Sequence, residues 1–252
     1  MNFKHLIFGF LALTFLGCKS DKFKLVKIEG NQIEISDSLK LDQDLSDFIK
    51  PYHDHLKKEL DSVLAYSPQT YTKDDGEYNT AIGNLIADII YEEGNPVFKS
   101  RTGHDIDLVI LNHGSIRAPI SKGNITLSTA YEIMPFENNI VVVAVKGKNI
   151  IDATRYLSKS KKAHPISKLK LAINSNQDIL EASINGKNID QEKTYYVATN
   201  DYLYNGGDHM TFFKPNDSAY ILHYKVRNAM IDYFTKADTI NPVIDNRFIK
   251  IN

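Results

Sequence analysis

The chain has 252 residues, with 30 Lys or Arg and 31 Asp or Glu, so its formal net charge is −1. Apolar residues make up 42% and charged residues 24%, which is ordinary globular usage and argues against a disordered chain or a coiled coil. The balanced charge argues against a basic nucleic-acid-binding protein, and the one Cys excludes an internal disulfide and a cysteine-rich zinc module. The length suits one large domain or two small ones.

The first residues have the features of an export signal. An apolar run, Leu6–Leu16, follows a positive residue and ends before Gly17-Cys18. It is too short to span a bilayer as a helix, which needs about 20 residues, but it is typical of a secretory signal. The run resembles the lipobox of bacterial lipoproteins, with Phe15 where Leu is usual. We therefore expect residues 1–17 to be a signal peptide and Cys18 to be lipidated. A plain signal peptide with an incidental Cys is the alternative.

The next segments are predicted to be a tether and a helix. Residues 18–43 are polar and have the pattern of a short hairpin around Gly30-Asn31. Over residues 44–66, apolar residues recur at helical spacing, which predicts a helix with Pro51 near its start or at a kink.

The remainder, 67–252, alternates between short strands and helices. A polar loop over 67–80 leads to a helix that begins near Ile82 and is expected to stop at Gly94. The later elements are expected at Leu108–Leu111 (strand), 128–133 (helix), Ile140–Val145 (strand), Asn149–Leu157 (helix), Leu169–Ile173, Ile179–Ile184 and Tyr195–Thr199 (strands), and Ala219–Phe234 (helix). An Asn-Gly pair at 185–186 marks a hairpin turn. Hairpins occur beside crossovers, so we predict an α+β fold rather than a doubly wound sheet.

Two glycine-containing loops follow apolar strands and carry groups suited to a ligand. In the first, Asn112 offers an amide and Arg117 a planar fork for phosphate or carboxylate. The alternative is a loop Arg paired with a surface carboxylate. In the second, Gly206-Gly207 lets the backbone approach a ligand, and Asp208 can accept hydrogen bonds from the vicinal hydroxyls of a ribose. The alternative is a glycine turn capped by the Asp.

Aromatic and metal-binding patterns differ in strength. Phe136 and Tyr202 are candidate platforms for stacking a flat ring, with core packing as the alternative. The eight His are scattered, and His53 and His55 lie two apart on an expected helix, so they face different ways. We therefore predict no metal site. A serine nucleophile elbow and a phosphate-binding P-loop are also absent from the sequence.

Taken in order, these motifs resemble the C-terminal, substrate-binding domain of the 5′-nucleotidase and UDP-sugar hydrolase family. The matching segments are Ile82–Asp88, Asn112–Arg117, Pro135–Asn138 and Asn200–Asp208. The helix from about 45 to 64 resembles the connector that joins that family's two domains, and the resemblance covers roughly residues 44–252. It implies a layered α/β/β/α domain that binds a nucleotide.

The resemblance also implies roles for individual residues. Phe136 and Tyr202 would sandwich the base, and Asp208 would hold the ribose hydroxyls. Asn112 would contact the base, and Arg117 would reach the phosphate. The substrate-binding set implied in this way is Asn112, Arg117, Phe136, Tyr202, Gly206, Gly207 and Asp208.

Two features depart from the family pattern. The Asp-x-His and Gly-Asn-His-Asp/Glu motifs of the family's N-terminal metallophosphatase domain appear nowhere in the sequence. No cofactor is therefore expected in this chain. The family usually has an Arg and a Glu just before the opening helix, where this sequence has Tyr78 and Asn79. One phosphate-binding Arg is thus missing, and Arg101 cannot be assigned to replace it.

The sequence therefore predicts the nucleotide-recognition half of a split 5′-nucleotidase that serves nucleotide catabolism and is inactive alone. A separately encoded metallophosphatase would supply hydrolysis and divalent metals. The expected location is the bacterial cell envelope, lipid-anchored and either periplasmic or surface-exposed, with no nucleic-acid partner. One alternative is a non-catalytic lipoprotein that binds nucleosides or nucleotides. Another is a stand-alone enzyme that uses Asp201, Asp208 and His209.

Overall fold

The computed structural model describes residues 24–36 and 38–251, so the predicted signal peptide and Cys18 lie outside the described residues. By its internal contacts the chain divides into Met1–Phe48 and Ile49–Asn252. Residues 24–36 contain no helix or strand, so the predicted hairpin is wrong. No helix in the described ranges has the length and apolar character needed to cross a membrane.

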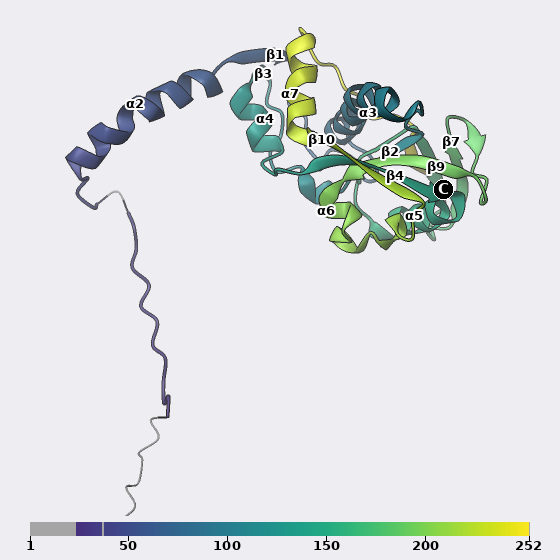
Figure 1. The fold of residues 1–252 in the computed structure, drawn as a ribbon, viewed down its shortest axis with the longest axis horizontal. Coiled ribbons are helices and arrows are strands. Elements are labelled where there is room, and N and C mark those ends of the chain that lie inside the picture. Colours follow the sequence, from purple (N-terminus) through teal and green to yellow (C-terminus); the bar gives the residue numbers. More distant parts are fainter. Residues whose placement is uncertain (1–23, 37, 252) are drawn as a thin grey trace, which may run out of the picture. The chain divides into compact units, whose positions relative to one another are not determined.

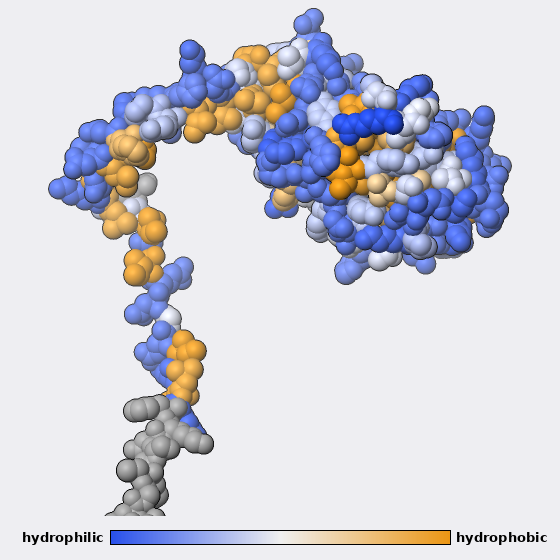
Figure 2. All heavy atoms as spheres, viewed as in Figure 1, coloured by the Kyte–Doolittle hydropathy of each residue, from blue (hydrophilic) through white to orange (hydrophobic). Residues whose placement is uncertain are grey.

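Helix α2 (Gln43–Leu60) has an apolar face but no buried residue. At its start the Leu45 N–H donates to Asp42 Oδ1 at 3.0 Å. Figure 2 shows exposed apolar surface, in orange, along this helix. The helix was expected to continue beyond residue 60. Instead, Val63–Ser67 forms strand β1, which pairs antiparallel with β3 (Gly123–Thr126).

A five-stranded mixed sheet lies at the centre of the unit Ile49–Asn252 (Figure 1). In the order of the sheet its strands are β10 (Ser218–Lys225), β4 (Asn139–Lys146), β9 (Thr194–Asn200), β2 (Leu108–Ile110) and β5 (Ile166–Ser167). β2 runs parallel to β9, and the other neighbours are antiparallel. Successive side chains point to opposite faces, so Val142 and Val141 belong to two different cores.

Helices and a second sheet cover the two faces of the central sheet. Apolar residues of α3 (Ala81–Thr102) and α7 (Val226–Lys236) share one core with it. On the other face the core includes α5 (Gly147–Ser160) and the second sheet. The second sheet consists, in spatial order, of β11 (Phe248–Lys250), β6 (Leu169–Ile173), β7 (Ile179–Ile184) and β8 (Lys187–Asn188). This layered arrangement confirms the predicted α+β fold.

Helix α3 continues past the predicted stop at Gly94. A Cβ added at Gly94 would meet Ile106, Ile140 and Leu222 at 3.7–3.8 Å, so this position lies against the apolar core rather than in a turn. The C-cap is Gly103, whose φ of 77° is left-handed and whose N–H donates to the Lys99 carbonyl. The prediction was wrong because a helical glycine in contact with the core and a terminating glycine look alike in sequence.

The predicted last helix begins as a strand. Ser218–Lys225 forms β10 and pairs with β4, and only Val226–Lys236 is helical. In this strand Leu222 is buried while Ile221 is 48% exposed, which is the alternation of a strand with one buried face. The apolar run fits helical spacing equally well, and the partner strand β4 decides between the two.

Candidate functional site

The predicted site residues come from loops at one edge of the five-stranded sheet. β2 and β9 are parallel, and β4 is antiparallel to β9, so the carboxyl ends of β2 and β9 meet the amino end of β4. The loops at this edge line a cavity of about 320 Å³, here called the sheet-edge cavity. Its lining residues are Asn112, Gly114, Ser115, Arg117, Phe136, Asn138, Tyr202 and Asp208.

Asp208 is held by three hydrogen bonds. Its Oδ2 accepts from Asn112 Nδ2 at 2.8 Å and its Oδ1 from the Tyr202 hydroxyl at 2.8 Å. Its backbone carbonyl accepts from the Tyr156 hydroxyl at 2.8 Å. A carboxylate has about four lone-pair sites, so both oxygens retain capacity for further donors. Asn112 Oδ1 is buried and has no hydrogen-bond partner within the described ranges.

Gly206 and Gly207 shape the loop without lining the cavity. Gly206 has a φ of 92°, which is open to glycine. A Cβ at Gly207 would lie 2.5 Å from the Tyr202 ring, so only glycine lets that ring lie over the backbone. Asp208 and His209 follow with φ of 50° and 59°, a strained pair of left-handed residues. The two glycines thus act here through conformation.

Phe136 and Tyr202 lie at the cavity and not in the core. They are 40% and 47% exposed, respectively, so the core-packing alternative does not hold for either ring. Donation to Asp208 anchors the Tyr202 hydroxyl and raises its pKa above the ordinary value. Both residues are therefore partly exposed where they line the cavity.

A carboxylate ties the two aromatic-bearing segments together. Asp201 opens helix α6 (Asp201–Tyr204), and its Oδ2 accepts from the Asn139 N–H at 3.0 Å and from Asn139 Nδ2 at 3.1 Å. The Asn200 side chain caps the same helix by accepting from the Leu203 N–H at 2.9 Å. Asp201 does not line the cavity, so its position is that of a brace.

Charge at the cavity comes from Arg117 and Asp208. The exposed Arg117 donates from Nη1 to the Gly114 carbonyl at 3.4 Å and has no carboxylate partner within the described ranges. In the loop that carries Asn112 and Arg117, the His113 N–H donates to His164 Nδ1 at 3.3 Å. Burial lowers the pKa of His164 to about 4 and lowers that of His113, so both rings are neutral at pH 7. No three His, Cys, Asp or Glu side chains of the described residues gather as metal ligands.

Residues 61–215 match the family model described as "5'-nucleotidase, C-terminal domain". The chain belongs to this family.

The chain is also similar to individual proteins over most of its length. The chain is 25% identical over 236 residues to cell wall protein Lmo0130 of Listeria monocytogenes, covering 77% of this chain and 30% of that protein. It is 23% identical over 265 residues to a 5'-nucleotidase of Diplobatis ommata, covering 96% of this chain and 45% of that protein. The chain therefore spans less than half the length of these relatives.

Solved structures show the same fold. The 5'-nucleotidase precursor of Thermus thermophilus superposes with a TM-score of 0.69 at 23% identity, over 82% of this chain and 43% of that chain. The NAD nucleotidase of Haemophilus influenzae superposes with a TM-score of 0.61 at 16% identity, over 84% of this chain and 42% of that chain.

In this 5′-nucleotidase C-terminal domain, Tyr78 and Asn79 have a structural role. Tyr78 is buried with its ring 4.9 Å from that of Phe248. Asn79 Nδ2 donates to the carbonyls of Asp245 at 3.1 Å and Phe248 at 2.8 Å. Neither residue lines the sheet-edge cavity, and neither does Arg101, which lies in the last turn of α3.

The sequence reasoning missed Asn138, Ser115 and Tyr156. Asn138 lines the cavity and belongs to the same motif as Phe136, so the motif itself was the signal that could have found it. Ser115 lies in the short 3-10 helix His113–Ser115 and also lines the cavity. Tyr156 comes from α5 and reaches Asp208 from behind, a contact between residues 52 positions apart that no local pattern reveals.

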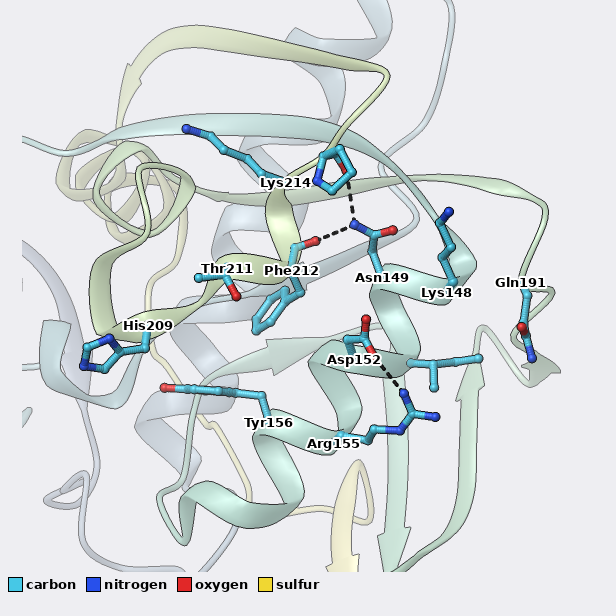
Figure 3. A pocket seen from close by; sticks show the side chains of 12 residues that line it. Lys148, Asn149, Asp152, Arg155, Tyr156, Gln191, His209, Thr211, Phe212 and Lys214 are labelled. Atoms are coloured by element: carbon cyan, nitrogen blue, oxygen red, sulfur yellow. Dashed lines mark hydrogen bonds and ion pairs between the residues drawn. The ribbon is translucent and has the colours of Figure 1, made fainter.

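A second hollow of about 520 Å³ lies between α5 and the segment 209–215 (Figure 3). Asn149 fastens that segment by donating to the carbonyls of Phe212 at 3.0 Å and Pro215 at 3.1 Å. The Tyr156 ring lines this hollow while its hydroxyl holds Asp208. His209 also lines this second hollow and not the sheet-edge cavity, so Asp201, Asp208 and His209 do not share one site.

Proposed function

We propose that the sheet-edge cavity binds a nucleotide or nucleoside, and that the chain is the recognition half of a split 5′-nucleotidase. The observation that carries the proposal is the cavity's pair of exposed aromatic rings beside a braced carboxylate. Phe136 and Tyr202 stack the base, and Asp208 accepts the ribose hydroxyls. Asn112 contacts the base, and Arg117 reaches the phosphate.

A separate metallophosphatase chain supplies the hydrolytic step in this proposal. It contributes the divalent metals that activate water and stabilise the phosphoryl transition state. The present chain contributes positioning, which is worth several kcal/mol in well-oriented reactions. Support comes from family membership and from the cavity's two exposed rings beside the braced carboxylate. The alternative, a non-catalytic nucleoside- or nucleotide-binding protein, uses the same cavity.

Phosphate release from the purified chain, from the metallophosphatase chain and from their mixture tests the proposal. We expect the present chain alone to hydrolyse nucleoside monophosphates no faster than buffer, and the mixture to exceed the metallophosphatase alone. Arg117→Ala should reduce that gain roughly tenfold or more by removing a charge-assisted contact to phosphate, while nucleoside binding is unchanged. The exposed Lys122→Ala is the control. Robust metal-dependent phosphate release by the present chain alone would contradict the split-enzyme proposal. If the mixture releases phosphate no faster than the metallophosphatase alone, the non-catalytic binding protein is favoured.

Asp208→Asn tests the ribose contact. We expect it to weaken ribonucleoside binding by about 1.5–3 kcal/mol, because a hydrogen bond to a charged acceptor is lost. A 2′-deoxynucleoside should lose less, since one of its two donors is already missing. Calorimetry on both ligands measures the difference, with the exposed Asp178→Asn as control. Equal losses for the two ligands would mean that Asp208 does not hold the ribose.

We also propose that Cys18 anchors the chain by lipid to the bacterial cell envelope. Cys18 is the one cysteine of the sequence and follows the apolar run directly after Gly17. Cys18→Ser should abolish labelling by a radiolabelled fatty acid and shift the chain out of the membrane fraction, because no other thiol can be acylated. Ser20→Ala should leave both unchanged. Undiminished labelling of Cys18→Ser would refute the anchor.

A further inference from the structure

The segment that presents Phe136 contains neither helix nor strand. It connects helix α4 (Leu127–Ile133) to β4, and its Phe136 ring is 40% exposed. An exposed ring on an irregular segment keeps one position only if contacts from other elements hold the backbone of that segment. The fixing group is Arg227 in the first turn of α7, which is only 3% exposed.

Arg227 holds the backbone on both sides of the phenylalanine. Its Nη1 donates to the carbonyls of Met134 and Phe136, each at 3.4 Å. Its guanidinium lies 4.1 Å from the centre of the Tyr131 ring, which covers it from the side of α4. A planar guanidinium can make these contacts together, whereas a lysine ammonium on the same stem has no such fork.

The next residues of the segment are fastened to the same end of α7. Arg227 Nη2 and Lys225 Nζ both pair with the Glu137 carboxylate. Hydrogen bonds from Lys225 and Arg227 lower the pKa of Glu137 to about 2, so its carboxylate is ionised at neutral pH. The Val226 N–H donates to the Asn138 carbonyl at 3.0 Å. Every residue from 136 to 138 is therefore held by the start of α7.

We infer that Arg227 is a positioning residue for the nucleoside base, acting through Phe136 and not through contact with the ligand. It lies outside the lining of the sheet-edge cavity. Its hydrogen bonds fix the position of the Phe136 ring. The Asp201–Asn139 contact fixes the segment that carries Tyr202. This inference rests on the proposed nucleoside site. The following experiment distinguishes a wrong site from a wrong role for Arg227.

A double-mutant cycle with adenosine as the probe tests the inference. By calorimetry, Arg227→Met should weaken adenosine binding roughly five- to fifty-fold in the parent chain and hardly at all in the Phe136→Ala background, because coupled residues are not additive. In the Asp208→Asn background the loss should persist in full. NMR should also show a reduced ring-current shift of the adenine protons with Arg227→Met, a signature that general destabilisation of the chain does not produce.

Matched variants keep the test decisive. Lys236 lies on the same helix as Arg227, does not line the cavity and pairs with Glu93 of α3, so Lys236→Met should bind adenosine like the parent. If Arg227→Met does not fold, as judged by circular dichroism, the exposed Glu137→Gln replaces it in the cycle with a smaller loss of the same pattern. An equal loss with and without Phe136 would overturn the positioning role. Failure of the parent chain to bind adenosine would overturn the nucleoside site itself, and this inference with it.

Discussion

Replacing Phe136 or Tyr202 by alanine is expected to weaken adenosine binding by roughly 1–3 kcal/mol per ring, about 5- to 150-fold, as for other base–aromatic stacks. Both rings line the sheet-edge cavity and are exposed, so their removal should cost little stability. Tyr202→Phe keeps the ring and loses only the 2.8 Å bond to Asp208, so it should retain most of the affinity. Isothermal titration calorimetry measures all three variants.

An exposed aromatic residue outside the cavity provides the control for this prediction. Tyr66 in β1 is 41% exposed, close to the value for Phe136, and it should tolerate replacement by alanine without loss of affinity. If the Phe136 and Tyr202 variants bind adenosine as the parent does, the base lies elsewhere and the assignment of the cavity is wrong.

Arg247→Met is expected to lower the free energy of unfolding by roughly 2–4 kcal/mol, because two carboxylates and a carbonyl lose their hydrogen-bond donor. The Arg247 guanidinium donates to Asp88 at 2.9–3.0 Å, to Asp245 at 2.8–3.0 Å and to the Ile166 carbonyl at 2.8 Å. Its side chain is 16% exposed, but both carboxylates are more than a third exposed, so solvent screening keeps the cost below that of a fully buried pair. Urea denaturation measures the loss.

Arg247→Met should also change how the free energy of unfolding depends on pH in the acid range. Burial raises the pKa of Asp245, but hydrogen bonds from Arg247 outweigh it, so the folded pKa lies below the ordinary value. This contribution is therefore present at neutral pH and is lost as pH falls from about 4 through the folded pKa. The free energy of unfolding of Arg247→Met should therefore fall less steeply over that pH range than that of the parent. Arg155→Met breaks an exposed pair with Asp152 and should cost about 0–1 kcal/mol at any pH, and an equal cost for both variants would refute the network.

Local sequence signals specified much of the fold. Leu169–Ile173 and Ile179–Ile184 form strands with the predicted bounds, and the Asn185-Gly186 turn has positive φ at both residues. The errors occur where one pattern has two physical meanings. The apolar run of β10 fits a helix until β4 pairs with it, and Gly94 resembles a stop until the core contacts it.

The same limit applies to the candidate site. Asn112, Arg117, Phe136, Tyr202 and Asp208 were predictable as a group because their motifs resemble those of the family, and the structure brings all five to one cavity at one sheet edge. The groups that hold them were not, because they arrive from distant parts of the chain. Tyr156 and Arg227 were not predicted, and the latter acts on a segment 90–93 positions earlier in the sequence.

Asparagine side chains at the start of α3 have their hydrogen-bond partners near the C-terminal end of the chain. Asn79 and Asn84 bind the carbonyls of Asp245, Phe248 and Val243, which lie 159–169 residues further along the chain. Contacts between residues so far apart in sequence form slowly, because the entropy of closing a long loop is lost before the contacts stabilise the chain. Until the segment with Phe248 is free to fold, the chain therefore carries unpaired amides beside an open core. During that interval it should be most vulnerable to proteases and most in need of a chaperone.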